Sequence, residues 1–250
     1  MYDVITRRAV LLLAACLATT MGSVVLAESP AGVDLLVAKD SPLKKGEAIA
    51  FFGDSITQGG AGAGGYCRLI DEAIAENRPE LGVKIIYAGI SGHKVPDLQG
   101  RLERDVLSKK PTVVFSYIGI NDVWHSTRGR GTPKDKFEAG LRDLIKKITE
   151  ASAVVVLATP STIGEVPDGS NPLDPMLEEY SAISRKVAKE TGMHLCDLRK
   201  AFIEHLKKHN SKKEYRGVLT RDGVHLNADG NQFVADQAAA AIAAALKQRK

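Results

Sequence analysis

The sequence predicts a single α/β domain of three layers, in which helices cover both faces of a parallel, five-stranded sheet. Short apolar segments alternate five times with helical segments along the 250 residues. Turn-forming residues bound the apolar segments, which is typical of strands that are covered on both faces. Crossovers between parallel strands are right-handed and need a helix as cover, so the alternation indicates one three-layer domain.

The first strand is predicted at residues 48–52, an apolar run without charge that breaks off at Gly53 into small polar residues. The residues before it, 28–46, contain two prolines and show no clear period. We therefore expect 28–46 to be a lead-in segment and the domain to span residues 47–250.

The other elements follow in order. Four further strands are expected at residues 83–88, 112–118, 153–158 and 194–198. Helices are expected at about residues 66–77, 96–107, 174–191 and 228–247, with one more beginning at residue 133 and another ending near residue 209. Thr132 is the predicted N-cap of the helix that begins at Pro133. The stretch 160–175, with four prolines and two glycines, is expected to form a lip over the carboxyl edge of the sheet.

Residues 1–27 are predicted to be an export signal, cleaved before Glu28. Arg7 and Arg8 precede an uncharged run of 19 residues that ends in small side chains. We expect a periplasmic or extracellular protein without membrane insertion after cleavage. Two alternatives stay open: an uncleaved membrane anchor, which polar residues within the run disfavour, and a lipid anchor at Cys16.

Charge and cysteines exclude several functions. The formal net charge of +4 at pH 7 is too small to indicate a nucleic-acid-binding protein. The basic residues between 207 and 216 are best explained as a solvated helix end and loop. After cleavage two cysteines remain, Cys67 and Cys196. One pair without framework spacing in a chain of this length favours two separate buried thiols.

Polar residues gather where predicted strands end. Ser55 follows the first strand, Gly92 follows the second and Asn121 follows the third. Ligands bind beyond the carboxyl ends of strands in open α/β sheets, so chemistry is expected at this edge. A serine hydroxyl needs a base and the base needs an orienting group; Asp222 and His225, three residues apart on one loop, have the spacing to supply both.

Four blocks with these residues occur in the order typical of one hydrolase superfamily: Gly53-Asp54-Ser55, Gly89-Ile90-Ser91-Gly92, Gly119-Ile120-Asn121-Asp122 and Asp222-Gly223-Val224-His225. The chain therefore resembles the GDSL hydrolases, also called the SGNH superfamily. The resemblance implies a flavodoxin-like strand order 2-1-3-4-5 and a catalytic triad of Ser55, His225 and Asp222. It further implies an oxyanion hole of the Ser55 and Gly92 backbone N–H groups and the Asn121 side-chain amide.

Other interpretations of the motifs are weaker. Glycines between residues 60 and 65 match a dinucleotide-binding pattern, but six residues separate them from Gly53 and no acidic residue ends the second strand. Asp54 is expected to cap a turn and not to act as a catalyst. No set of side chains recurs at metal-ligand spacing, so neither a metal nor a cofactor is expected.

The predicted function is that of an exported serine esterase that removes short acyl groups, acetyl above all, from a carbohydrate or polyol. Two alternatives remain: a lipase, thioesterase or lysophospholipase acting on longer chains, and a non-catalytic carbohydrate-binding relative. Trp124 and His125, on the loop after Asn121, are the predicted substrate-binding residues. Trp124 has a second interpretation as a core residue, since large aromatic side chains are mostly buried.

Overall fold

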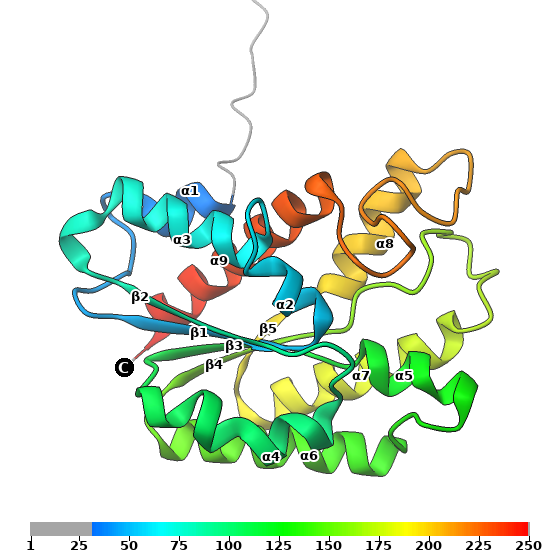
Figure 1. Ribbon diagram of the computed structural model, residues 1–250, viewed down its shortest axis with the longest axis horizontal. Coiled ribbons are helices and arrows are strands. Elements are labelled where there is room, and N and C mark those ends of the chain that lie inside the picture. Colours follow the sequence, from blue (N-terminus) through cyan, green and yellow to red (C-terminus); the bar gives the residue numbers. More distant parts are fainter. Residues whose placement is uncertain (1–31, 250) are drawn as a thin grey trace, which may run out of the picture.

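Five parallel strands lie in the order β2-β1-β3-β4-β5 in a computed structural model that describes residues 32–249 (Figure 1). The strands are β1 (Ala48–Gly53), β2 (Lys84–Gly89), β3 (Val113–Tyr117), β4 (Val154–Ala158) and β5 (His194–Cys196). The central strand β1 is buried along its whole length, as its apolar sequence predicts. The α/β class and the strand order implied by the family resemblance are both confirmed.

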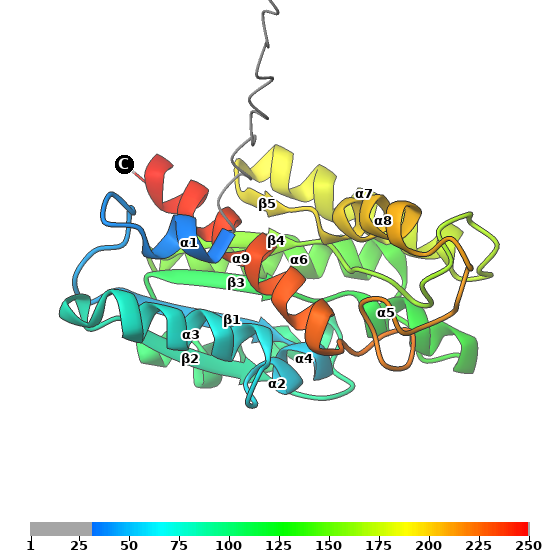
Figure 2. The ribbon, with the colours of Figure 1, turned by 90° about the horizontal axis from the view of Figure 1, so that it is seen from above.

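Helices cover both faces of the sheet (Figures 1 and 2). One layer contains α4 (Val95–Asp105), α6 (Lys134–Glu150) and α7 (Asp174–Thr191), which pack against one another in that order. The opposite layer contains α1 (Gly32–Val37), α3 (Tyr66–Asn77) and α9 (Ala228–Gln248). Because the buried face of α9 consists largely of alanine, this helix lies close against β3, β4 and β5.

The remaining helical elements connect these layers to the strands. They are α2 (Ser55–Gly60), α5 (Ile120–Trp124), α8 (Leu198–His209) and three 3₁₀ turns, η1 (Pro79–Leu81), η2 (Leu107–Lys109) and η3 (His125–Arg128). The helix α8 reaches the α9 layer through its Phe202 ring, whose centroid lies 5.4 Å from that of Phe233. Both α2 and α5 begin within two or three residues of a strand end, so they start at the carboxyl edge of the sheet.

The structure differs from the sequence-based expectations in four places. The lead-in contains α1, which packs so closely on α9 that a Cβ at Gly32 would overlap the Asp236 carbonyl. The N-cap of α6 is Pro133 and not Thr132, because the Thr132 backbone is tied elsewhere, its N–H to the Asp122 carbonyl and its carbonyl to the Tyr180 hydroxyl. The segment 123–131 begins inside α5 and continues as η3. The last strand ends at Cys196, because α8 already starts at Leu198.

Cys67 and Cys196 are free, buried thiols, in agreement with the interpretation of the sequence. Among the described residues, no helix has both the length and the apolar character that crossing a membrane requires. The predicted export signal, residues 1–27, and the alternative lipid anchor at Cys16 lie outside the residues that the structure describes.

Candidate active site

Ser55 is the first residue of α2 and follows directly on the central strand. Asp54 is the N-cap of this helix, and its carboxylate accepts a hydrogen bond from the Ile56 N–H at 2.9 Å. Gly53 permits the tight turn, since a Cβ there would lie 2.4 Å from the Tyr117 carbonyl oxygen. The N–H of Ser55 lies at the start of the helix and has no partner among the described residues.

The ends of β1 and β2 are joined by a buried guanidinium. Arg101 donates hydrogen bonds to the carbonyl oxygens of Gly53 at 2.7 Å and Ala88 at 2.9 Å. Its planar group also lies over the Phe52 ring, 4.6 Å from the centroid, and Asp105 balances its charge at 3.2 Å. These contacts fix the strand ends from which Ser55 and the Gly92 turn continue.

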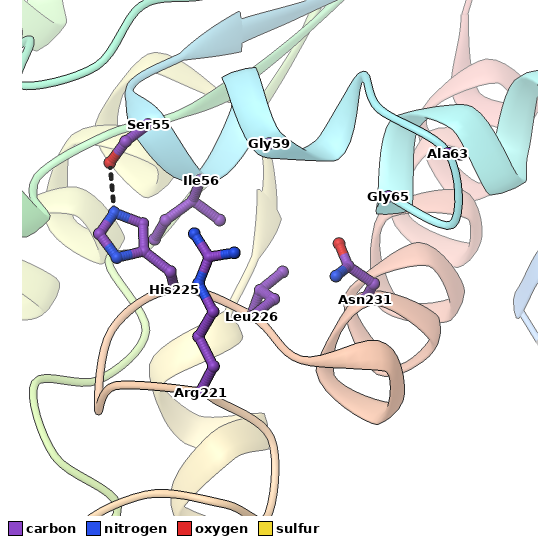
Figure 3. A pocket seen from close by; sticks show the side chains of 9 residues that line it. All are labelled: Ser55, Ile56, Gly59, Ala63, Gly65, Arg221, His225, Leu226 and Asn231. Carbon is purple, nitrogen blue, oxygen red and sulfur yellow. Dashed lines mark hydrogen bonds between the residues drawn. The ribbon is translucent and has the colours of Figure 1, made fainter.

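Ser55, His225 and Asp222 form one chain of hydrogen bonds, although Ser55 and His225 are 170 residues apart (Figure 3). The Nε2 atom of His225 lies 2.9 Å from Ser55 Oγ, and its Nδ1 lies 2.7 Å from Asp222 Oδ2. The second carboxylate oxygen of Asp222 accepts the N–H groups of Val224 and His225. The structure thus brings together the three side chains that the sequence singled out.

The charge of Asp222 favours one tautomer of the His225 ring. Burial raises the pKa of Asp222, but hydrogen bonds from the His225 ring and from two backbone N–H groups outweigh burial, so its pKa is lowered. Asp222 is therefore a carboxylate over the ordinary pH range, and a carboxylate holds the imidazole proton on Nδ1. The Nε2 atom is then left to accept the Ser55 proton.

The three predicted oxyanion donors follow strand ends that are paired in register, Gly53 with Gly89 and Gly53 with Tyr117. Gly92 lies in a turn with a φ of +77°, and its N–H has no partner among the described residues. Asn121 is 3% exposed, and its Nδ2 donates one proton to the His93 carbonyl at 3.1 Å. That bond ties the Asn121 amide to the Gly92 turn and leaves a second N–H available.

Two buried carboxyl groups lie beneath these donors. Burial raises the pKa of Asp54 to about 7, with a further contribution from the nearby Asp122. Burial likewise raises the pKa of Asp122 to about 6. One oxygen of Asp122 accepts the Val95 N–H at 3.2 Å, where α4 begins after the Gly92 turn. The capping role expected of Asp54 agrees with its position.

A third buried carboxylate, Glu165, holds the loop that carries Asp222 and His225. It accepts the consecutive N–H groups of Val218, Leu219 and Thr220. Two backbone bonds join the same segments, from Gly164 N–H to the Gly223 carbonyl and from Glu165 N–H to the Tyr215 carbonyl. Sequence reasoning missed Glu165, because nothing within the loop 160–175 distinguishes it locally.

One hollow is lined by Ser55 and His225, and a second is lined by Trp124, whose ring packs against His225. The first, which we call the Arg221 pocket, has a volume of about 170 Å³ and is lined by Ser55, Ile56, Gly59, Ala63, Gly65, Arg221, His225, Leu226 and Asn231 (Figure 3). The second, the Trp124 pocket, has a volume of about 490 Å³ and is lined by Trp124, Thr127, Ile163, Val166, Ser170, Asn171, Pro172, Leu173 and Tyr215. The loop expected to form a lip thus supplies one wall of the Trp124 pocket.

The two predicted substrate-binding residues differ in position. The half-buried Trp124 ring meets the His225 ring edge to face, with 6.4 Å between centroids, and also lines the Trp124 pocket. His125 lines neither pocket. Burial lowers the pKa of its imidazole, and the charges of Lys94 and Arg130 lower it further. Within residues 32–249 no group of three His, Cys, Asp or Glu side chains has the arrangement of a metal site.

Comparison with known proteins identifies relatives across most of the chain. An acetylxylan esterase from Geobacillus stearothermophilus is 33% identical over 209 residues, which cover 76% of this chain and 91% of that protein. Among solved structures, an acetyl xylan esterase called AlAXEase is 46% identical with a TM-score of 0.74, over 76% of this chain and 96% of that one. The acetylxylan esterase Axe2 from Geobacillus stearothermophilus is 31% identical with a TM-score of 0.68, over 78% and 94%.

A family model described as GDSL-like lipase/acylhydrolase matches residues 51–233, a range that begins in β1 and ends in α9. It therefore contains all four of the blocks from which the resemblance was drawn. The chain belongs to the GDSL-like lipase/acylhydrolase family and is a carboxylic ester hydrolase.

Proposed function

We propose that this chain is an exported serine esterase that removes acetyl groups from a carbohydrate. The observation that carries the proposal is the hydrogen-bonded chain from Ser55 Oγ through His225 to Asp222, with distances of 2.9 and 2.7 Å. The acetylxylan esterases among the relatives support acetyl as the acyl group and a saccharide as the alcohol.

In the proposed reaction, Ser55 Oγ attacks the ester carbonyl carbon while His225 Nε2 takes the hydroxyl proton. The negative charge that develops on the carbonyl oxygen is stabilised by the N–H groups of Ser55 and Gly92 and by the Asn121 amide. When the tetrahedral intermediate collapses, the C–O bond to the sugar breaks and His225 protonates the leaving oxygen. Water, deprotonated by His225, then attacks the carbonyl carbon of the acetyl-serine; the bond to Ser55 Oγ breaks, acetate leaves, and His225 returns the proton to Ser55.

The Trp124 pocket has the groups to receive a sugar ring, but six of its nine lining residues are apolar or aromatic, so the preference for a saccharide over a long acyl tail rests on the acetylxylan esterase relatives. It combines the indole ring with polar groups from Thr127, Ser170 and Asn171. A sugar ring has an apolar face and hydroxyl edges, and therefore matches a wall that presents an aromatic face and hydrogen-bonding groups together. We propose that Trp124 contacts the sugar directly and that His125 contributes at the margin of the site.

Export is proposed from residues 1–27, which have the charge and the apolar run of a signal peptide. Cleavage before Glu28 removes this segment, while a lipid anchor at Cys16 is the alternative.

A series of nitrophenyl esters of increasing acyl length, assayed beside acetate release from acetylated xylo-oligosaccharides, tests the proposal. We expect kcat/KM to be highest for the acetyl ester and to fall with each lengthening. A rise with acyl length would replace the proposal with a lipase or thioesterase activity. Binding of the saccharide without acetate release would indicate a non-catalytic relative.

The saccharide contact is tested by Trp124→Ala and His125→Ala. Both are expected to lower kcat/KM for an acetylated oligosaccharide more than for nitrophenyl acetate, whose leaving group is small. Equal losses on the two substrates would mean that these residues support the fold or the triad and do not contact sugar.

A further inference from the structure

The charged groups that line the Arg221 pocket are all of one sign. Arg221 is the one charged side chain among the nine lining residues, and no carboxylate lines the pocket. Figure 3 shows its guanidinium beside the His225 ring, turned toward the helix that carries Ser55 and Gly59. The proposed reaction uses Ser55 and His225 from this pocket but gives Arg221 no role.

Arg221 also lacks the partners that most guanidinium groups of this chain have. Arg101, Arg185 and Arg199 each form ion pairs with carboxylates, whereas Arg221 forms no side-chain hydrogen bond or ion pair with a described residue. Its backbone is nevertheless fixed, since its N–H donates to the His225 carbonyl at 2.8 Å. The root of the side chain is therefore held beside the triad while five N–H donors stay free.

The opposite wall includes a backbone donor in an exposed turn. The Ala63 N–H, in the glycine-rich turn after α2, has no hydrogen-bond partner among the described residues. Asn231 holds this wall in place by accepting the Tyr66 N–H at 3.0 Å and donating to the Asn227 carbonyl at 2.8 Å. A small hollow with a guanidinium, a free N–H and no acidic group is suited to an anion, and a planar guanidinium matches a carboxylate in particular.

The position of the pocket indicates which part of the substrate enters it. Gly92 and Asn121, the donors proposed for the carbonyl oxygen, are not among its lining residues, whereas His225 is. His225 must reach the leaving oxygen to protonate it, so the alcohol part of the ester lies beside this imidazole. The acetyl ester carries no charge, so an anion bound at Arg221 before acyl transfer belongs to the saccharide; the other anion of the reaction is the acetate that is released at the end.

We propose that Arg221 selects saccharides that carry a carboxylate near the acetylated position, such as those containing a uronic acid. This inference rests on the proposed carbohydrate esterase function and names its substrate class more closely. In an oligosaccharide the Trp124 pocket receives a neutral sugar ring and the Arg221 pocket receives the acidic group; a monosaccharide tests the Arg221 contact alone.

The test uses pairs of substrates that differ in one group. Methyl glucuronide and methyl glucoside, each monoacetylated at the 2, 3 or 4 position, share the ring and the ester and differ only in a carboxylate or a hydroxymethyl group. We expect at least one acidic substrate to have a kcat/KM about threefold to tenfold above that of its neutral partner, the range for a partly exposed charged hydrogen bond. Added salt should lower this ratio.

Variants assign the preference to Arg221. Arg221→Gln should bring the ratio close to one, and Arg221→Lys should keep part of it, because a charge remains without the planar fork. Arg216→Gln is the matched control: Arg216 is exposed, as Arg221 is, and lies on the same loop, but it lines neither pocket, so its removal should leave the ratio unchanged. A ratio is unaffected by any loss that the two substrates share.

Three outcomes overturn the inference. The first is a ratio near one for every pair in the wild type. The second is a preference that Arg221→Gln retains. The third is that added acetate inhibits the wild type but not Arg221→Gln, while the ratio is the same in both. That result would assign the site to the released acetate. Failure of the proposed function is distinguishable, since neither the acidic nor the neutral acetyl sugars would then be hydrolysed.

Discussion

Ser55 follows a strand at the centre of the sheet, whereas Asp222 and His225 lie on the loop 210–227 between α8 and α9. The strand side is buried: all of β1 is enclosed, and Asp54 and Asn121 are nearly inaccessible. The loop side is open, with a run of exposed residues from 211 to 217 and with 40% of the Asp222 side chain accessible. The two halves of one hydrogen-bonded chain are therefore held by different physical means.

On the strand side, many contacts share the task of positioning. Register pairing, the Arg101 bonds to strand ends and the close turn at Gly53 all fix the start of α2. On the loop side, three consecutive backbone N–H groups converge on the single carboxylate of Glu165. The difference suggests that a substitution far from the chemistry is most damaging where positioning depends on one residue.

The largest effect is expected for Ser55 and His225, the proposed nucleophile and base, where the two regions meet. Ser55→Ala and His225→Ala should each lower kcat by about 10⁴ to 10⁶, and Asp222→Ala by less, because an orienting group contributes less than the base it orients. Acetate release by folded variants under saturating substrate measures this. Substantial activity in Ser55→Ala would contradict the assignment of Ser55 as the nucleophile, and with it the comparison of the strand side with the loop side.

A smaller loss is expected on the strand side for Asn121→Ala, about 10² to 10³ in kcat with KM little changed, since its amide acts on charge that develops in the transition state. Steady-state kinetics with nitrophenyl acetate separate the two constants. An effect confined to KM would contradict the oxyanion role. Asn121→Asp, which replaces the donor with a charged acceptor of similar size, should be at least as damaging.

On the loop side, Glu165→Gln should lower kcat by about 10 to 10², because the amide that replaces one oxygen cannot accept a backbone N–H and the loop loses its alignment. Glu204→Gln, at an exposed residue on α8 paired only with Lys200, is the matched control and should have wild-type kinetics. The thermal unfolding midpoint is measured in parallel. An unchanged kcat in Glu165→Gln would show that the loop is aligned without this carboxylate.

Much of the strand side was predictable from the sequence, since apolar runs that end in Gly53, Gly89 and Gly119 mark the carboxyl edge of a parallel sheet. The approach of His225 to Ser55 was inferred only from the order of the four blocks, because no local pattern encodes a contact over 170 residues. Glu165 escaped notice because its partners are backbone groups more than 50 residues away. Arg221 was not singled out from the sequence either; its position directly before Asp222 is the one local signal that could have identified it.

The smallest effect concerns the pH dependence of stability and distinguishes the buried carboxyl of Asp54 from a carboxyl whose pKa is lowered. Burial raises the pKa of Asp54 from 3.8 to about 7, so between these values the folded chain holds one proton more than the unfolded chain. Wild-type stability therefore falls as the pH rises through this window, by up to about 1.4 kcal/mol per pH unit, and Asp54→Asn lacks this loss. The variant should gain stability relative to the wild type between pH 5 and pH 8.

Urea unfolding of both proteins at the two pH values measures that gain. Asp143→Asn is the control: hydrogen bonds from Gln99 and Lys147 lower the pKa of Asp143, so it is ionised in both states throughout the window. Its stability relative to the wild type should not change between pH 5 and pH 8. The same behaviour in Asp54→Asn would contradict the burial argument.

Covalent labelling with a fluorophosphonate tests the acyl-serine mechanism most directly. Peptide mapping by mass spectrometry should find one adduct, on Ser55, because the Asp222 and His225 pair activates this hydroxyl and the oxyanion donors hold the phosphonyl oxygen. Labelling should be lost in Ser55→Ala and greatly slowed in His225→Ala. An adduct that persists in Ser55→Ala, or a wild type that hydrolyses acetyl esters yet remains unlabelled, would contradict Ser55 as the nucleophile.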